Sequence, residues 1–175
     1  SFISASLIQK LQHMSAHTFF DGEALQTAAL FHDMGLLLLA CYFPETLQLI
    51  LEDQDSTQSE YLESEKRATG KSCHAELAGS LLEKWKLSPD ISIPIRFRET
   101  PQNSPGKYKQ MVHLIDCTDT IINQVLPSPF SPIRSEDEVK TVFVQNGLSV
   151  EVLPELIDFV QAESDKVRTL LSMWG

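Results

Sequence analysis

The residues best suited to chemistry are an adjacent histidine and aspartate, His32 and Asp33, within the apolar stretch 28–40. Neighbours on a helix point about 100° apart, so this imidazole and carboxylate could share a metal ion only if other helices supplied further ligands. Burying an aspartate in apolar surroundings is costly unless it is paired or bound to a metal. The alternative interpretation is a hydrogen-bonded core histidine with Asp33 as its partner.

Further candidate ligands lie downstream of this pair. Asp116 and Asp119 follow His113 at intervals of three residues, so the three fall on neighbouring parts of one helix face. The apolar residues around them predict that Asp116 is buried, whereas Asp119 alone is better interpreted as part of a solvated acidic stripe. His74 stands at the start of a predicted helix, where a structural role is the simpler interpretation.

The sequence gives little support for other enzyme motifs. His13 and His17 have a spacing that can bind zinc, but the glutamate that a zinc peptidase needs as general base is missing between them. The sequence contains neither G-x-S-x-G nor a phosphate-binding glycine loop. Neither a zinc peptidase nor a serine hydrolase is therefore indicated.

The composition is that of an acidic globular chain. It has 175 residues, of which 42% are hydrophobic, and a formal net charge of −10. Such a surface repels phosphate backbones and anionic lipid, so we expect neither a nucleic-acid nor a membrane partner. The longest apolar run, residues 34–43, is too short to span a membrane. The three cysteines, Cys41, Cys73 and Cys117, form no C-x-x-C pair, which favours a reducing, cytoplasmic environment. Each is expected to pack as a small apolar residue.

Helical periodicity along nearly the whole chain predicts an all-α fold. The principal expected helices are residues 2–17, 21–40, 46–51, 61–69, 107–124 and 150–174, with loops at 52–59, 100–106 and 126–132. Gly70 should end one helix, and Ser72 should cap the next. Ser88 with Pro89 should begin another helix, and Ser135 with Glu138 should form a capping box. The residues after the proline-rich loop are expected to pack back onto the body. We therefore expect one domain over residues 1–175, cropped from a longer protein.

Several segments together resemble the HD superfamily, and more closely its HD-related output domain (HDOD) branch. The matching segments are Ala29–Gly35, Glu65–Gly70, His74–Gly79, Leu81–Leu87, Val112–Asp116 and Leu148–Glu151. The resemblance covers nearly the whole chain and implies an HD-like multi-helix bundle with a long C-terminal helix. It implies a tentative metal-ligand set of His32, Asp33, His74 and Asp116, with a divalent metal ion as the only candidate cofactor.

The chain departs from the family pattern at positions that bear on function. HD hydrolases use an earlier histidine, whose position falls at or just before Ser1. Dinucleotide-cleaving relatives carry a His-His pair where this chain has Phe97 and Arg98. The exchange removes two neutral ligands and brings a guanidinium toward the metal position, where its charge would oppose a divalent cation.

The retained HD segments and the depleted ligand set indicate a regulatory module in bacterial signal transduction. We expect it to be non-catalytic and to bind signalling proteins such as a receiver, a histidine kinase or a cyclic-dinucleotide enzyme. The alternative is a metal-dependent phosphohydrolase acting on a nucleotide or cyclic dinucleotide, with His32, Asp33 and Asp116 holding the metal. A third interpretation is an anion site at Arg96 and Arg98, although residues two apart do not share a helix face.

Overall fold

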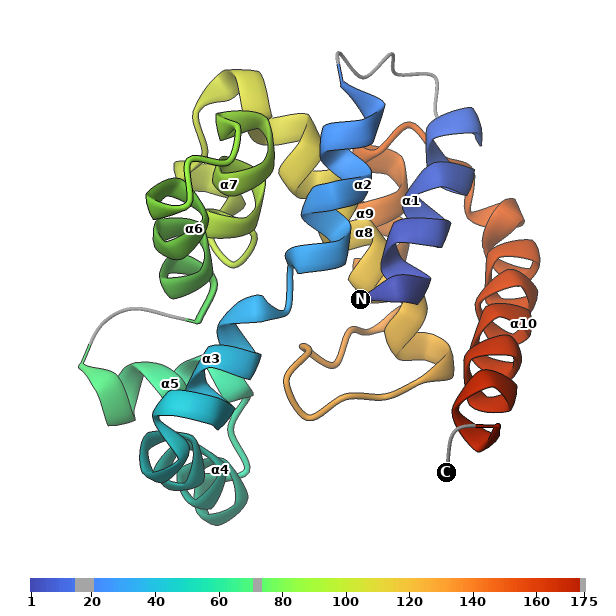
Figure 1. The fold of residues 1–175 in the computed structure, drawn as a ribbon. Helices are drawn as coiled ribbons and strands as arrows, with labels where there is room; N and C mark the ends of the chain where they lie inside the picture. The colour runs from blue at the N-terminus through green and yellow to red at the C-terminus, as the bar shows by residue number, and fades with distance from the viewer. Residues whose placement is uncertain (15–20, 71–73, 174–175) are drawn as a thin grey trace.

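The computed structural model describes residues 1–14, 21–70 and 74–173, and its regular elements are helices (Figure 1). The all-α prediction is therefore confirmed. The α-helices are α1 (Phe2–Met14), α2 (Gly22–Phe31), α3 (Met34–Tyr42), α4 (Pro44–Thr57), α5 (Tyr61–Thr69), α6 (His74–Lys84), α7 (Pro89–Arg96), α8 (Lys109–Val125), α9 (Glu136–Gln145) and α10 (Leu153–Ser172). Short 3₁₀ turns, η1 (Pro101–Asn103), η2 (Gly106–Tyr108) and η3 (Val150–Val152), lie before α8 and α10.

Local signals place several helix ends where the sequence predicts them. Gly70 ends α5 with a left-handed backbone (φ 76°), and its N–H donates to the carbonyl of Lys66. The predicted capping box of Ser135 and Glu138 begins α9. Ser88 begins α7 by accepting a hydrogen bond from a backbone N–H two residues later. The ends predicted at residues 17, 72 and 174 lie outside the described part of the chain.

The central predicted helix, residues 21–40, is broken in the structure. Phe31 ends α2 and Met34 begins α3, so His32 and Asp33 form a turn between two helices. α2 packs against α1 and α7, whereas α3 packs against α4 and α6. Gly35 allows the close approach of α6, because a Cβ atom there would overlap the backbone carbonyl of His74. Different packing partners on the two sides thus override the continuous helical pattern.

Two further expectations need correction. The segment predicted as a loop, residues 52–59, continues α4 as far as Thr57, and Gln58 then turns left-handed (φ 54°). The polar side chains of this segment are compatible with a helix because they lie on its outer surface. There Asp53 accepts a hydrogen bond from Arg67 of α5. Cys41, expected to pack as a small apolar residue, is exposed, whereas Cys117 is buried. Cys73 lies outside the described part of the chain.

The buried side chains form two separate apolar clusters. The main core lies between α1, α2, α6, α7, α8, α9 and α10, and its largest fully buried members include Leu25, Leu114 and Phe143. The small core lies between α3, α4 and α5, around Ile50 and Tyr61. Figure 1 shows α3, α4 and α5 together at one corner of the molecule, away from α10.

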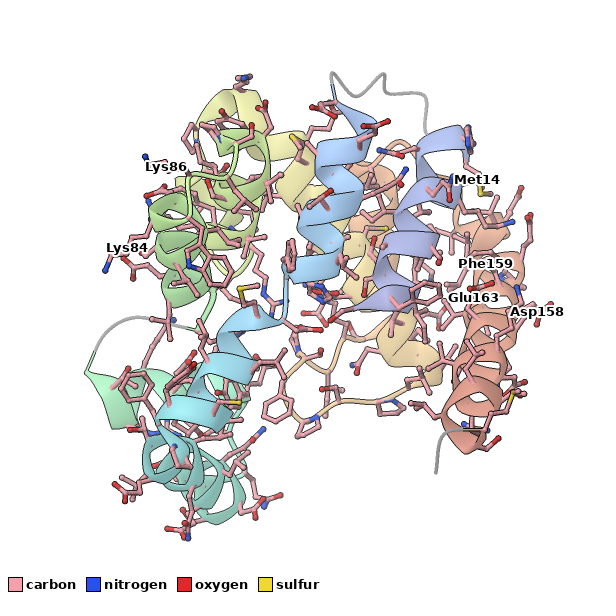
Figure 2. All side chains as sticks on the ribbon, viewed as in Figure 1. Met14, Lys84, Lys86, Asp158, Phe159 and Glu163 are labelled. Carbon is pink, nitrogen blue, oxygen red and sulfur yellow. The ribbon has the colours of Figure 1, made fainter. Side chains whose placement is uncertain are left out.

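The long C-terminal helix predicted from the family resemblance is present as α10. It packs along α1 and α8. Phe159 of α10 lies against the main core (Figure 2). The ammonium of Lys10 on α1 stands 5.2 Å from the centre of its ring. Residues after the proline-rich loop therefore contact the body of the bundle, as expected.

The helical stretch formed by α2 and α3 corrects the expectation about membrane-spanning length. Gly22–Tyr42 covers 21 residues with a hydropathy of 1.4, which suffices to cross a membrane by length and composition. In this fold, 39% of that window is buried. One such helix near an N-terminus is weak evidence for a span, since a core helix or a signal sequence meets the same criteria.

Candidate functional site

His32 is buried at the turn between α2 and α3, 3% exposed. Its Nδ1 lies 2.6 Å from the carbonyl oxygen of Ala29, which can only accept a hydrogen bond. Its Nε2 lies 3.1 Å from Oδ1 of Asp33 and 3.0 Å from Oδ1 of Asp119. Because both ring nitrogens face acceptors, this geometry suits a protonated imidazolium. Burial lowers the pKa of His32, but the carboxylate of Asp119 outweighs it and holds the pKa above its ordinary value.

Asp119 of α8 is the acidic residue that completes this contact, and its interpretation as a solvated stripe is wrong. About three quarters of its side chain is covered. Burial raises the pKa of Asp119, but the charges of His32 and Arg98 outweigh burial and hold the pKa below its usual range. Asp119 is therefore a carboxylate in a buried ion pair.

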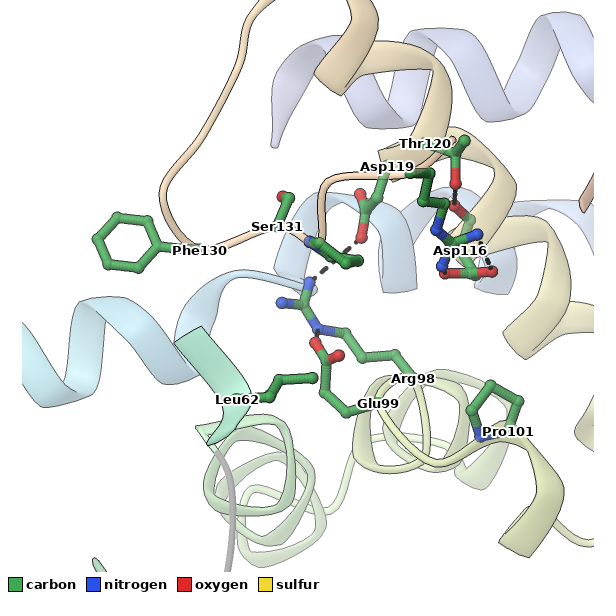
Figure 3. Close-up of a pocket in the computed structure, with 11 residues that line it drawn as sticks. Leu62, Arg98, Glu99, Pro101, Asp116, Asp119, Thr120, Phe130 and Ser131 are labelled. Carbon is green, nitrogen blue, oxygen red and sulfur yellow. Dashed lines mark hydrogen bonds and ion pairs between the residues drawn. The ribbon is translucent and has the colours of Figure 1, made fainter. Parts of the chain in front are cut away.

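Arg98 lies at the centre of the same cluster, just after α7, with 7% of the residue exposed. Its Nη1 lies 3.3 Å from Oδ1 of Asp33 and 3.5 Å from Oδ2 of Asp119. Its Nη2 lies 2.8 Å from Nε2 of His74, and its Nε lies 2.8 Å from Oε1 of Glu99. Figure 3 shows the guanidinium between Asp119 and Glu99. The prediction that Arg98 brings a positive charge to the His-Asp pair is confirmed.

His74, the first residue of α6, is bound on both sides of its ring. Its backbone N–H donates to Oε1 of Glu65 at 2.8 Å, and its Nδ1 lies 3.1 Å from Oε2 of the same residue. Because a guanidinium only donates, Nε2 of His74 must accept from Arg98, which assigns its proton to Nδ1 and leaves the ring neutral. Both His74 and Glu65 are about 1% exposed, so the pair joins α5 and α6 from within.

Asp116 does not join the cluster around His32. Nη1 of Arg134 donates to its Oδ2 at 3.0 Å, and Nη2 donates to its Oδ1, which makes a two-point ion pair. Burial raises the pKa of Asp116 by more than Arg134 lowers it. Asp119, one turn further along α8, takes the place beside His32 that the family resemblance had given to Asp116. The rotation of α8 about its own axis determines which of the two aspartates faces His32.

The structure separates the other predicted residues as well. His13 is exposed, and His17 lies outside the described residues. Arg96 donates to Glu83 at 2.8 Å and stays outside the cluster around Arg98, so the two arginines do not form one anion site. Sequence reasoning did not single out Glu65 or Glu99 as members of a site. The only signal for Glu65 was its place in a family segment.

The cluster does not fit a divalent metal ion as it stands. Among the described residues, no group of three His, Cys, Asp or Glu side chains could hold one. The physical reason is the guanidinium: the lone pair of His74 and the carboxylates of Asp33 and Asp119 already face Arg98. A metal would have to displace that charge. The four-residue ligand set implied by the resemblance therefore stays a prediction.

Two cavities border the cluster. One, of about 450 Å³, has mainly apolar walls and reaches His32 and Asp33. The other, of about 170 Å³, lies on the side of Asp116 and Glu99 (Figure 3). Phe130 of the proline-rich loop lines both cavities, and its ring packs edge-on against Tyr61 with centroids 5.1 Å apart. The loop thereby connects the end of α8 to the small core.

A helical bundle with a His-Asp pair at the break of its central helices is an HD-type fold. The family model of the HDOD domain matches residues 1–101, more than half of the chain. The chain belongs to the HDOD family.

One solved structure has the same fold, that of a proposed signal transduction protein from Marinobacter aquaeolei VT8. The TM-score is 0.78 over 98% of this chain at 20% sequence identity. The chain spans 37% of the length of that protein. No curated protein gives a significant match.

Proposed function

We propose that this chain is a regulatory signal-transduction module with a degenerate HD site. It is non-catalytic and acts by binding a partner protein. The observation that carries the proposal is the position of Arg98, whose guanidinium contacts Asp33, Asp119 and His74 at 3.5 Å or less.

A guanidinium cannot replace a catalytic metal at this place. Metal-assisted hydrolysis needs an ion that binds water, lowers the pKa of that water and keeps a coordination position open for substrate. Arg98 has only donor groups, remains charged at any physiological pH and offers no lone pair to a metal or a proton. It pairs with the carboxylates and leaves no Lewis acid to activate water. The arrangement therefore supports the role of a fixed ion cluster.

The comparisons support the signalling part of the proposal. The chain is an HDOD member, and the protein from Marinobacter aquaeolei that shares its fold is described as a proposed signal transduction protein. The partner we propose is a receiver, a histidine kinase or a cyclic-dinucleotide enzyme in the bacterial cytoplasm. The acidic net charge of −10 argues against nucleic acid as the partner.

One observation favours a second candidate function, a metal-dependent phosphohydrolase. Nε2 of His32 lies within 3.1 Å of a carboxylate oxygen of Asp33 and of Asp119, so three groups of ligand type are neighbours. A nucleotide or cyclic dinucleotide would be its substrate. This activity requires Arg98 to leave the cluster, which would expose three carboxylates to one another.

The test compares metal binding by wild type and by an Arg98→His variant. Each protein is incubated with Mn²⁺, Fe²⁺, Ni²⁺ or Zn²⁺, desalted and subjected to elemental analysis, and hydrolysis of bis(p-nitrophenyl) phosphate is followed. We expect substoichiometric metal and no hydrolysis for wild type. Arg98→His, which exchanges the guanidinium for a ligand, should retain more metal. Arg96→His is the matched control, because Arg96 pairs with Glu83 outside the cluster.

Metal-dependent turnover by wild type would overturn the proposal if it disappears in both His32→Ala and Asp33→Ala variants that remain helical by circular dichroism. That result would establish the phosphohydrolase. Stoichiometric metal in wild type without turnover would also contradict the degenerate site, because it would place an ion where the proposal places Arg98.

A further inference from the structure

The larger cavity beside the ion cluster has the size and lining of a small-molecule site. Its volume is about 450 Å³, within the range of roughly 300–1,000 Å³ typical of ligand pockets. Its apolar walls come from α1, α3, α4, α8 and the proline-rich loop. They include Leu36, Leu37, Leu47, Ile122, Leu126 and Phe130. Only one end of the cavity carries charged side chains.

The most exposed charged side chains at that end belong to two aspartates. The side chains of Asp33 and Asp119 are 35% and 24% exposed. Those of His32 and Arg98 are 4% and 6% exposed, although both residues line the cavity. A molecule that enters along the apolar walls therefore finds the two carboxylates more accessible than either positive side chain.

The whole cluster also contains more negative than positive groups. Its four carboxylates belong to Asp33, Glu65, Glu99 and Asp119. Its positive groups are the guanidinium of Arg98 and the imidazolium of His32. Glu99 is the carboxylate nearest to Arg98, at 2.8 Å from its Nε, and Asp33 and Asp119 share the same guanidinium at 3.3 and 3.5 Å. Because the carboxylates outnumber the positive groups, a further cation at Asp33 and Asp119 is electrostatically favoured.

Neighbouring polar side chains do not meet this requirement. Asn123 accepts a hydrogen bond from the backbone of Ser128 and donates to the carbonyl of Pro132. The hydroxyl of Ser128 accepts from the backbone of Phe130. These groups hold the loop in place and leave the charged end of the cavity to the two aspartates.

We propose that this cavity binds a small organic cation: a primary ammonium with an aliphatic or aromatic tail. The ammonium would lie against Asp33 and Asp119, and the tail would lie along Leu37, Leu47 and Phe130. The cavity volume corresponds to roughly 15 water molecules, so the proposed occupant is a free small molecule. The inference rests on the proposed function, because a metal ion at the same carboxylates would supply the missing charge.

The experiment uses three probes of equal chain length that differ only in their polar head: octylammonium, octanol and octanoate. Isothermal titration calorimetry on the full chain measures each affinity with and without a metal chelator. We expect octylammonium to bind about tenfold more tightly than octanol, as a charge-assisted hydrogen bond predicts. Octanoate should bind more weakly than octanol.

Two variants test the charged end and the apolar wall separately. Asp33→Asn should weaken octylammonium binding about tenfold and leave octanol unchanged. Glu83→Gln removes the same charge from a surface ion pair outside the cavity and should leave the affinity for both probes unchanged. Leu37→Gln should weaken both probes; because Leu37 is 64% exposed, this change does not depend on a buried position that folding requires.

Equal affinity for the three probes, a preference for octanoate, or no binding of any probe would overturn the inference. The chelator separates this failure from failure of the proposed function. Binding of octylammonium only after chelation, with metal found by elemental analysis, would sink the degenerate site while supporting the cation cavity. Metal-free protein that binds no probe would remove the cavity proposal alone.

Discussion

The main core and the small core of this molecule are built differently. The main core joins seven helices around fully buried side chains such as Leu114 and Phe143. The small core has three buried members, Leu39, Ile50 and Tyr61, and depends on partly buried neighbours from α3, α4 and the proline-rich loop. The ion cluster around Arg98 lies where the two meet. Apolar packing therefore positions the helices of the main core, whereas polar contacts largely position the helices around the small core.

α3 shows this difference within one helix. Apart from its ends its residues are apolar on every side, a pattern typical of a helix covered all round. Only Gly35 and Leu39 are buried, while Leu37 is 64% exposed. Its position therefore depends on contacts at a few points, chiefly the close approach to α6 and the bonds of Asp33. These contacts are the places at which the comparison can be tested.

The largest expected effect comes from equal cavities made in the two cores. Leu114→Ala should lower the global free energy of unfolding by about 3 kcal/mol, because it leaves a cavity among fully buried side chains. Ile50→Ala, also at a fully buried position, should lower it by less than about 1 kcal/mol and instead ease local opening of α4 and α5. Urea unfolding measures the first quantity, and amide hydrogen exchange measures the second.

Equal losses of global stability from Leu114→Ala and Ile50→Ala would break the comparison, because they would show that the two cores unfold as one unit. Faster amide hydrogen exchange in α8 of the Ile50→Ala protein would also indicate that the two cores unfold as one unit.

A smaller effect is expected at the contact between α3 and α6. Gly35→Ala places a Cβ atom against the backbone of His74, which cannot move as a flexible side chain would, so it should cost about 2 kcal/mol. Gly106→Ala is the matched control, since nothing lies within 4 Å of the added atom. Thermal unfolding followed by circular dichroism compares the two. A Gly35→Ala protein as stable as the control would mean that α3 can shift to accommodate the added Cβ atom without loss of stability.

The smallest effect concerns pH. The pKa of His32 is raised above 6.5 in the folded state, so its ion pair stabilises the fold fully below pH 6.5 and less as the pH rises through the folded value. At the acid end, Asp119 has a lowered pKa, so its contribution is lost only below pH 3.8. The stability difference between wild type and His32→Gln should therefore be largest below pH 6.5 and shrink as the pH rises above 6.5. A difference that grows over this range in urea titrations would refute the ion pair.

Much of the helical framework could be predicted because its signals are local. Gly70, the pair Ser88-Pro89 and the capping box of Ser135 each satisfy backbone groups within a few residues of themselves. Such a signal needs no knowledge of the rest of the fold. The family segments added the bundle and its long final helix, which the structure confirms.

The errors arose where tertiary contacts decide. Three residues along a helix fall about 60° short of a full turn, so Asp116 and Asp119 point in different directions, and only the packing of α8 determines which faces His32. The break after Phe31 likewise depends on α6, which is distant in the sequence. Arg98 is a different case: its identity at a family histidine position was enough to predict its place, since the scaffold around it is retained.

The break between α2 and α3 has an electrostatic consequence of its own. His32 is the C-cap of α2, at the negative end of that helix dipole, and Asp33 is the N-cap of α3, at the positive end of the next. A continuous helix would give neither charge such a partner. Two helix ends meeting at this dipeptide favour a cation on the histidine and an anion on the aspartate. The turn therefore polarises the His-Asp pair through its own backbone, before any other residue or ion contributes.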